Sequence, residues 1–107
     1  MKRYGMTIRI KAGCEAAYRR YHKAVWSEIV EMIHVCNIVN YSIFLKDDRL
    51  FSYFEYVGDD FKGDMAKMAA HAKTMEWWSV MEPMQEPLET RQLGEWWAEM
   101  EEVFHLE

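Results

Sequence analysis

The sequence has few residues of the kinds that stabilise very small secreted or metal-bound domains. Only two of its 107 residues are cysteines, Cys14 and Cys36, and they lack the spacing of metal ligands. They fall near opposite ends of one predicted helix, about 33 Å apart at roughly 1.5 Å per residue. A disulfide needs Cα atoms within about 7 Å of each other. We therefore expect two reduced thiols and a cytoplasmic location.

Long apolar runs and a basic stripe are also missing. The chain has no apolar run long enough to span a bilayer and no charged-then-apolar leader. Its formal charge is -5, with acidic and basic residues mixed along the whole chain. A nucleic-acid-binding protein normally carries a basic stripe. We expect neither a membrane nor a nucleic-acid partner, and a neutral small molecule or another protein fits better.

Hydrophobic and aromatic side chains are abundant. Half of the residues are hydrophobic and 15% are aromatic, with five tryptophans among them. A chain of this length forms one domain, here residues 1–107, with a real though small core. Five tryptophans are more than such a core needs, and large aromatic side chains also line ligand pockets.

The hydrophobic pattern predicts an α+β domain. Alternating apolar residues predict strands over 4–10, 39–45 and 50–57, and a β-branched, aromatic segment predicts a last strand over 100–106. A helical spacing predicts one long helix over 14–35. A second helix is predicted from about residue 61 with "GDD" as its cap, followed by a short helical stretch capped by Thr74. The order β-α-β-β-α-β is that of a ferredoxin-like domain, an antiparallel sheet with both helices on one face.

Such a sheet leaves its second face uncovered. The predicted strands carry aromatic side chains on both faces, and packing two sheets face to face would cover the second set. We therefore expect a homodimer that forms a dimeric α+β barrel.

A histidine lies on the apolar face of the first predicted helix. This is His22, with Tyr18 one turn before it. Burial without a partner would cost about 1–3 kcal/mol, so the ring either bonds a backbone carbonyl or faces a cavity. Tyr41 faces inward on a predicted strand, and the adjacent rings of Trp77 and Trp78 lie about 100° apart on a helix. Imidazole, phenols and indoles suit a neutral polyhydroxylated ligand, because indoles stack on sugar C–H surfaces and the other rings bond hydroxyls.

The remaining polar candidates carry weaker signals. His34 is expected to face solvent, His71 to lie at the boundary of the core, and His105 to be structural. Glu28 lies at the edge of the apolar face and is expected to form a salt bridge. No ligand spacing supports a metal site.

Four sequence blocks resemble, in order and spacing, the signature blocks of the L-rhamnose mutarotase family: "AAYRRYHKAVWSEI", "NYSIFL", "EWWSVM" and "MEEVFHL". The Tyr-x3-His-x3-Trp-x-Glu pattern is the most distinctive, followed by the Trp-Trp pair. Members of that family are dimeric α+β proteins that interconvert the anomers of a 6-deoxy sugar without a cofactor. The resemblance implies that His22 is catalytic, that Tyr18, Tyr41, Trp77 and Trp78 contact the sugar, and that no metal or cofactor takes part.

The sequence departs from the family pattern at two places. Ala24 stands where many members have proline, and "QEPLETRQLGEWWAE" does not match the usual loop before the last strand. This loop bears on sugar preference, so L-rhamnose is the expected sugar and L-fucose the next. Trp96 and Trp97 should point to opposite faces of the last strand, so at most one reaches the sugar.

Anomer exchange opens the sugar ring to the aldehyde and closes it on the other face. It needs a proton at the ring oxygen and the loss of one from the anomeric hydroxyl. A histidine near its usual pKa of about 6.5 populates both protonation states around neutrality. We expect His22 to protonate the ring oxygen on opening and to recover the proton on closure. Tyr18 and Tyr41 would orient hydroxyls and could assist at O1.

Two other functions fit the expected fold. A cofactor-free or haem-degrading monooxygenase uses a similar dimeric α+β barrel with its own histidine and tryptophan, which is support from fold analogy alone. A non-catalytic dimerisation domain would use the aromatic side chains only for packing. The agreement of four separate blocks favours the mutarotase over both.

Overall fold

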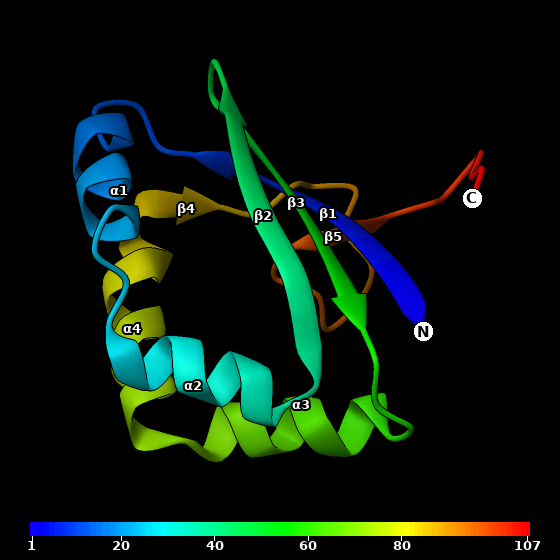
Figure 1. Ribbon diagram of the computed structural model, residues 1–107. Helices are drawn as coiled ribbons and strands as arrows, with labels where there is room; N and C mark the ends of the chain where they lie inside the picture. The colour runs from blue at the N-terminus through cyan, green and yellow to red at the C-terminus, as the bar shows by residue number, and fades with distance from the viewer.

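The computed structural model describes all 107 residues. Figure 1 shows its elements, which follow the predicted order except that the first helix is divided in two and a short strand, β4, precedes the last one. The elements are β1 (Lys2–Ile10), α1 (Glu15–His22), α2 (Ser27–Val35), β2 (Ile38–Lys46), β3 (Arg49–Tyr56), α3 (Phe61–Ala70), α4 (Ala72–Met81), a 3-10 turn (Glu82–Met84), β4 (Gln85–Glu86) and β5 (Ala98–Met100).

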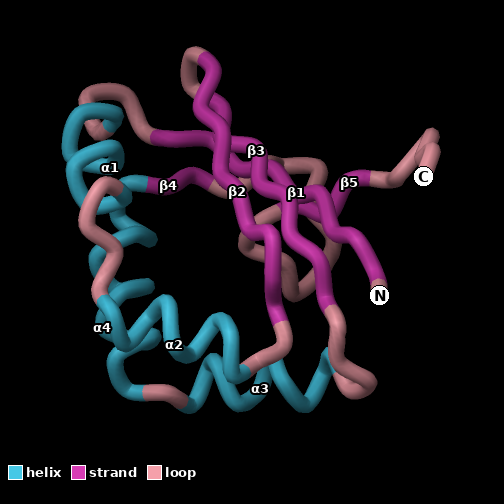
Figure 2. Tube along the Cα trace, in the orientation of Figure 1, coloured by secondary structure: helices cyan, strands magenta, loops and turns pink.

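The strands form one curled antiparallel sheet in the order β2-β3-β1-β4, with β5 also paired to β1. This is the predicted ferredoxin-like arrangement, so the expected fold class is confirmed. All four helices lie to one side of the sheet (Figure 2). None of them has both the length and the apolar character needed to cross a membrane.

Two buried hydrophobic clusters lie between the sheet and the helices. The first comprises Ile8, Ile10, Tyr18, Ile29, Leu50, Trp77, Met81 and Met84. The second comprises Tyr4, Ile38, Phe54 and Tyr56. Cys36 is fully buried and Cys14 partly so, and both thiols are free as expected.

The prediction of one continuous helix over 14–35 is wrong. Helix α1 ends at His22, and the extended backbone of Trp26, with ψ of 136°, precedes α2. The break contains neither glycine nor proline. The Trp26 indole packs edge-on against Trp77 of α4, with ring centroids 5.1 Å apart. Tertiary packing therefore overrides the local helical pattern.

Of the two helix caps predicted from the sequence, one is confirmed and one is wrong. Asp60 of the "GDD" stretch caps α3 as predicted and accepts a hydrogen bond from the Gly63 N–H at 3.0 Å. The predicted Thr74 cap is wrong, because α4 begins at Ala72 and His71 caps it. The imidazole Nδ1 of His71 accepts from the Thr74 N–H at 3.3 Å.

A β-bulge interrupts β2 where the strand borders the helices. Val39 and Ser42 are both paired with β3, but Asn40 and Tyr41 between them oppose the single residue Phe54. Asn40 takes up the left-handed backbone conformation at φ 49°, which asparagine tolerates better than most residues. The four residues of the predicted common face, Val39, Tyr41, Ile43 and Leu45, all border one cavity, although the bulge separates Val39 from the other three.

The predicted last strand over 100–106 is also wrong for most of its length. Strand β5 ends at Met100, and residues 101–107 are irregular and exposed. Figure 1 shows this tail extending away from the sheet. A strand needs a neighbour that pairs with its backbone, and beyond Met100 the tail is tied to β1 only through the side chains of Arg3 and Glu102, with Nε 3.0 Å from Oε2. His105, expected to be structural, lies in this exposed tail.

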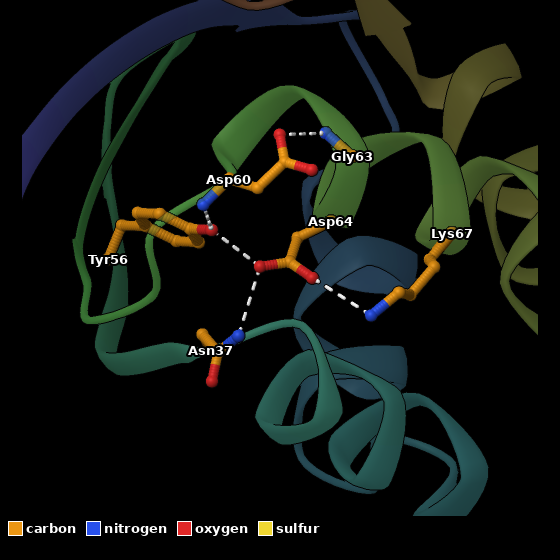
Figure 3. A network of polar contacts seen from close by, with 6 residues as sticks. All are labelled: Asn37, Tyr56, Asp60, Gly63, Asp64 and Lys67. Atoms are coloured by element: carbon orange, nitrogen blue, oxygen red, sulfur yellow. Dashed lines mark hydrogen bonds and ion pairs between the residues drawn. The ribbon is translucent and has the colours of Figure 1, made fainter.

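A polar network closes the end of the second core cluster (Figure 3). Asp64 of α3 is buried and accepts hydrogen bonds from the Tyr56 hydroxyl and from Asn37 Nδ2, with Lys67 Nζ 3.2 Å from its second oxygen. The same Tyr56 hydroxyl accepts from the Asp60 N–H at 3.0 Å. The network thus fixes the α2–β2 junction against the end of β3 and the start of α3.

Candidate active site

A cavity of about 500 Å³ lies between the first two helices, β2 and α4. Its wall carries four of the predicted site residues, which are Tyr18, His22, Tyr41 and Trp77. Known small-molecule sites have volumes of about 300–1,000 Å³. The cavity is therefore large enough for a monosaccharide.

The side chain of His22 is held between two aromatic rings. It stacks on Tyr18 with ring centroids 4.2 Å apart and meets Trp77 edge-on at 5.5 Å. Tyr18 lies one turn earlier in α1, at the spacing that brings side chains together on a helix. The imidazole is half-buried and has a fixed orientation at the cavity wall.

The two ring nitrogens of His22 have different surroundings. Nδ1 lies 2.8 Å from the backbone carbonyl oxygen of Tyr18. A carbonyl only accepts, so Nδ1–H donates, and in the neutral ring Nε2 carries the lone pair. Burial lowers the pKa of His22, and the backbone hydrogen bond opposes part of that effect. The residue therefore satisfies both sequence interpretations: one nitrogen bonds the backbone, and the other is a base without a protein partner.

Two phenols also line the cavity, together with the polar residues Arg19, His34 and Asn40. Tyr18 is 4% exposed, and its hydroxyl accepts a hydrogen bond from Gln85 Nε2 at 3.2 Å. Burial raises the pKa of Tyr18, against a smaller lowering by this bond. Although 41% of Tyr41 is exposed overall, the loss of hydration at its hydroxyl and the nearby Tyr18 phenol raise the pKa of Tyr41 to about 12. Both phenols are therefore protonated near neutrality and can donate.

Comparison with known proteins identifies the family. A sequence model of L-rhamnose mutarotase matches residues 3–106. The chain belongs to the L-rhamnose mutarotase family. It is 34% identical to an L-rhamnose mutarotase from Opitutus terrae, with 100% of both chains covered. It is also 37% identical to a UPF0734 protein from Dictyostelium discoideum, covering 84% of this chain and 76% of the relative.

Among solved structures, an L-rhamnose mutarotase from Formosa agariphila has a TM-score of 0.79 at 22% identity, with 100% of both chains covered. At that identity the likeness shows the fold. Mutarotases interconvert sugar anomers, so the predicted family and the predicted enzyme class, an isomerase, are confirmed. The match gives no support to the monooxygenase or dimerisation-domain alternatives.

In this mutarotase the two adjacent tryptophans, Trp77 and Trp78, have different surroundings. Trp77 is 6% exposed and lines the cavity, whereas Trp78 is 39% exposed and is absent from the wall. Successive residues of a helix point about 100° apart, so the inward position of one turns the other outward. The cavity geometry therefore gives no support to the predicted sugar contact of Trp78.

The sequence analysis missed Gln85, the buried residue that bonds Tyr18. It is 5% exposed, and its Oε1 accepts a hydrogen bond from Trp96 Nε1 at 2.8 Å. Trp97 packs on the first core cluster, and neither Trp96 nor Trp97 lines the cavity. Both Gln85 and Trp96 lie in the loop that departs from the family pattern. A buried amide between two aromatic rings has no local sequence signature.

The remaining polar candidates have different surroundings in this mutarotase. His34 is exposed as expected, although it lies at the cavity wall, and His71 is the half-buried cap of α4. Glu28 accepts a hydrogen bond from Ser27 Oγ at 3.2 Å and forms no salt bridge, so that prediction is wrong. No group of three or more histidine, cysteine, aspartate or glutamate side chains is placed to hold a metal ion.

Proposed function

We propose that this enzyme interconverts the α and β anomers of L-rhamnose by acid/base ring opening and closure at His22. One observation carries the proposal: the imidazole bonds the backbone through Nδ1–H and keeps a basic Nε2 at a cavity wall that it shares with two protonated phenols. An acid and a base side by side are what the reaction needs.

The lowered pKa of His22 favours its neutral form at the start of the reaction. The neutral ring takes the proton of the anomeric hydroxyl through Nε2, while a phenol, of Tyr18 or Tyr41, protonates the ring oxygen. The C1–ring-oxygen bond breaks as the C1=O1 bond forms. After rotation about C1–C2, both protons return and the ring closes on the other face. The sequence alone suggested the opposite first step, with the imidazole as donor.

The apolar part of the wall supports a 6-deoxy sugar. Of the 16 lining residues, nine are valine, isoleucine or leucine. A methyl group at C6 fits such a wall better than a hydroxymethyl group, whose hydroxyl would lose its hydrogen bonds to water. The indole of Trp77 offers a further apolar surface for the C–H groups of the ring. L-fucose is also a 6-deoxy sugar, so it is the second substrate to test.

Exchange spectroscopy by NMR tests the function directly, with each sugar at equilibrium and the spontaneous rate subtracted. We expect His22→Ala to lower the enzyme-dependent exchange by about 10²–10⁴-fold, the usual contribution of one acid/base group. His34→Ala is the matched control, because it removes another histidine from the same wall. Equal exchange rates for wild type and a folded His22→Ala protein would remove His22 from the chemistry.

We also propose that the enzyme is a homodimer joined through the outer face of its sheet. Phe44 is 63% exposed and Met100 39% exposed, and the tail beyond β5 adds exposed apolar residues. Phe44→Glu should convert a dimer to a monomer in sedimentation velocity, and a monomeric wild type would contradict the proposal. The single-domain organisation over residues 1–107 and the cytoplasmic location stay predictions of the sequence.

A further inference from the structure

We propose that Gln85 and Trp96 are positioning residues that aim the hydroxyl proton of Tyr18 into the cavity, which makes Tyr18 the acid for the sugar ring oxygen. This inference rests on the proposed function and deepens it, because it selects one of the two phenols. It also gives a role to the segment that departs from the family pattern.

The orientation of the Gln85 side-chain amide is determined by Trp96. The indole N–H only donates, and it lies 2.8 Å from the amide oxygen. A flipped amide would set two donors against each other in a buried place, since Gln85 is 5% exposed. The amide nitrogen therefore faces Tyr18, 3.2 Å from its hydroxyl oxygen.

The direction of the second hydrogen bond follows from the first. An amide nitrogen only donates, so the Tyr18 hydroxyl accepts and its own proton is left over. No protein group accepts that proton. Because Tyr18 lines the cavity, a sugar oxygen can take this place. The bond from Gln85 also stabilises the phenolate that forms when the proton leaves.

Tyr18 takes part in positioning both members of the proposed pair, its own hydroxyl as the acid and the imidazole of His22 as the base. Its carbonyl holds Nδ1–H of His22, and its hydroxyl is held by Gln85, while the two rings stack at 4.2 Å. The two reacting sugar oxygens, O1 and the ring oxygen, are bound to the same carbon. Nε2 of His22 takes the proton from O1, and the electron pair of the breaking C1–O bond stays on the ring oxygen, which takes the Tyr18 proton. Closure reverses both transfers.

Two substitutions at Gln85 test the direction of the hydrogen bond. Gln85→Glu keeps an acceptor for Trp96 but replaces the donor to Tyr18 by a second acceptor, so the phenol proton turns away from the cavity. We expect kcat to fall about as far as in Tyr18→Phe, on the order of 10²-fold, with KM for L-rhamnose within about twofold. Gln85→Met removes the bond and should lower kcat by roughly tenfold, the effect of about 1.4 kcal/mol.

Two controls separate positioning from general damage. Gln92→Glu adds the same charge to the same loop at an exposed residue and should leave kcat unchanged. Combining Gln85→Glu with Tyr18→Phe should be no worse than Tyr18→Phe alone, because both changes remove one interaction. Full additivity of the two losses would overturn the inference.

A readout without sugar checks the hydrogen bond itself. In protein labelled with ¹³C at the tyrosine ring ζ carbon, Tyr18→Phe identifies the Tyr18 resonance, and its titration in Gln85→Met should move to higher pH. An unmoved titration, or wild-type kcat in both folded Gln85 variants, overturns the inference while leaving the proposed function intact. A wild type that does not accelerate anomer exchange overturns the proposed function, and the acid role of Tyr18 with it.

Discussion

Two buried tyrosines, Tyr56 and Tyr18, differ in how their hydroxyl groups are hydrogen-bonded. Tyr56 is 5% exposed and Tyr18 4% exposed. The Tyr56 hydroxyl donates to Asp64 and accepts from the Asp60 N–H, so its hydrogen-bonding capacity is used on both sides (Figure 3). The Tyr18 hydroxyl accepts from Gln85 and donates to no protein group. A buried phenol with both partners is structural, and one with a spare proton at a cavity is available for chemistry.

The surroundings of the two phenols differ in the same way. Around Tyr56 there is no room, because a Cβ added at Gly58 would lie 2.5 Å from the Tyr56 hydroxyl and 2.8 Å from Asn37 Nδ2. Around Tyr18 lies a cavity of about 500 Å³. Around Tyr56 the hydroxyl is fully hydrogen-bonded and the packing is close. Around Tyr18 the hydroxyl keeps a free proton and the packing is open.

The sharpest test of this comparison exchanges the phenols for phenyl rings. Tyr18→Phe should lower the rate of anomer exchange by about 10²-fold and lower the melting temperature less than Tyr56→Phe does, because Gln85 loses a neutral partner and Asp64 loses a charge-assisted one. Tyr56→Phe should keep the exchange rate at 25 °C and lower the melting temperature by roughly 5–10 °C, because Asp64 loses a buried partner. NMR exchange and thermal unfolding measured on both variants check this. Reversed effects would break the comparison.

The pH dependence of catalysis gives the next largest effect. Because burial lowers the pKa of His22 in the free enzyme and we propose its neutral ring as the base, the enzyme-dependent kcat/KM should rise with pH to a plateau. The midpoint should lie below 6.5, and the rate should fall about tenfold per pH unit well below it. Exchange measured across pH 4.5–8 on wild type checks this. An enzyme-dependent rate that increases toward acid would mean that the imidazolium is the active form.

The hydrogen-bonded network around Tyr56 and Asp64 should instead determine how much stability the protein loses at acid pH. The hydrogen bond from Tyr56, with that from Asn37 next, lowers the pKa of Asp64 below its usual value. A lowered folded pKa means that this stabilisation is present above the unfolded pKa of about 3.9 and is lost as pH falls through the folded value. Asp64→Asn should therefore melt several degrees lower at pH 7 and lose less stability between about pH 5 and 3. Melting curves with equal acid slopes would show that Asp64 is not the group responsible.

The smallest expected effect separates the adjacent tryptophans. Trp77→Phe removes part of the cavity wall and should raise KM for L-rhamnose several-fold, whereas Trp78→Phe should change KM by less than about twofold. Steady-state exchange at several sugar concentrations checks both variants. A larger effect from Trp78 would restore the sugar contact expected from the sequence.

The sequence predicted those parts of the molecule that depend on local spacing. Tyr18 and His22 meet because they are one helical turn apart, and Asp60 caps α3 by a bond to a backbone N–H three residues on. The strand order follows from the ferredoxin-like element order. Each of these features is determined by contacts within a few residues or by the order of elements along the chain.

The features it missed depend on residues far apart in the chain. Gln85 and Tyr18 are separated by 67 positions, and the pairing of β4 with β1 brings them together. The helix break after His22 depends on the contact of Trp26 with Trp77. A clue to this break was present in the resemblance, because the family's proline at the position of Ala24 would end a helix there.

The early end of α1 also has an electrical consequence for the reaction. His22 is the last residue of that helix, so its ring lies where the peptide dipoles converge with their negative ends. A proton taken from the sugar would make the imidazole of His22 cationic. A helix C-terminus typically stabilises a cation by about 0.3–1 kcal/mol. In the proposed mechanism, burial thus favours the neutral imidazole before the reaction, and the aligned carbonyls of the helix end favour its short-lived cationic form.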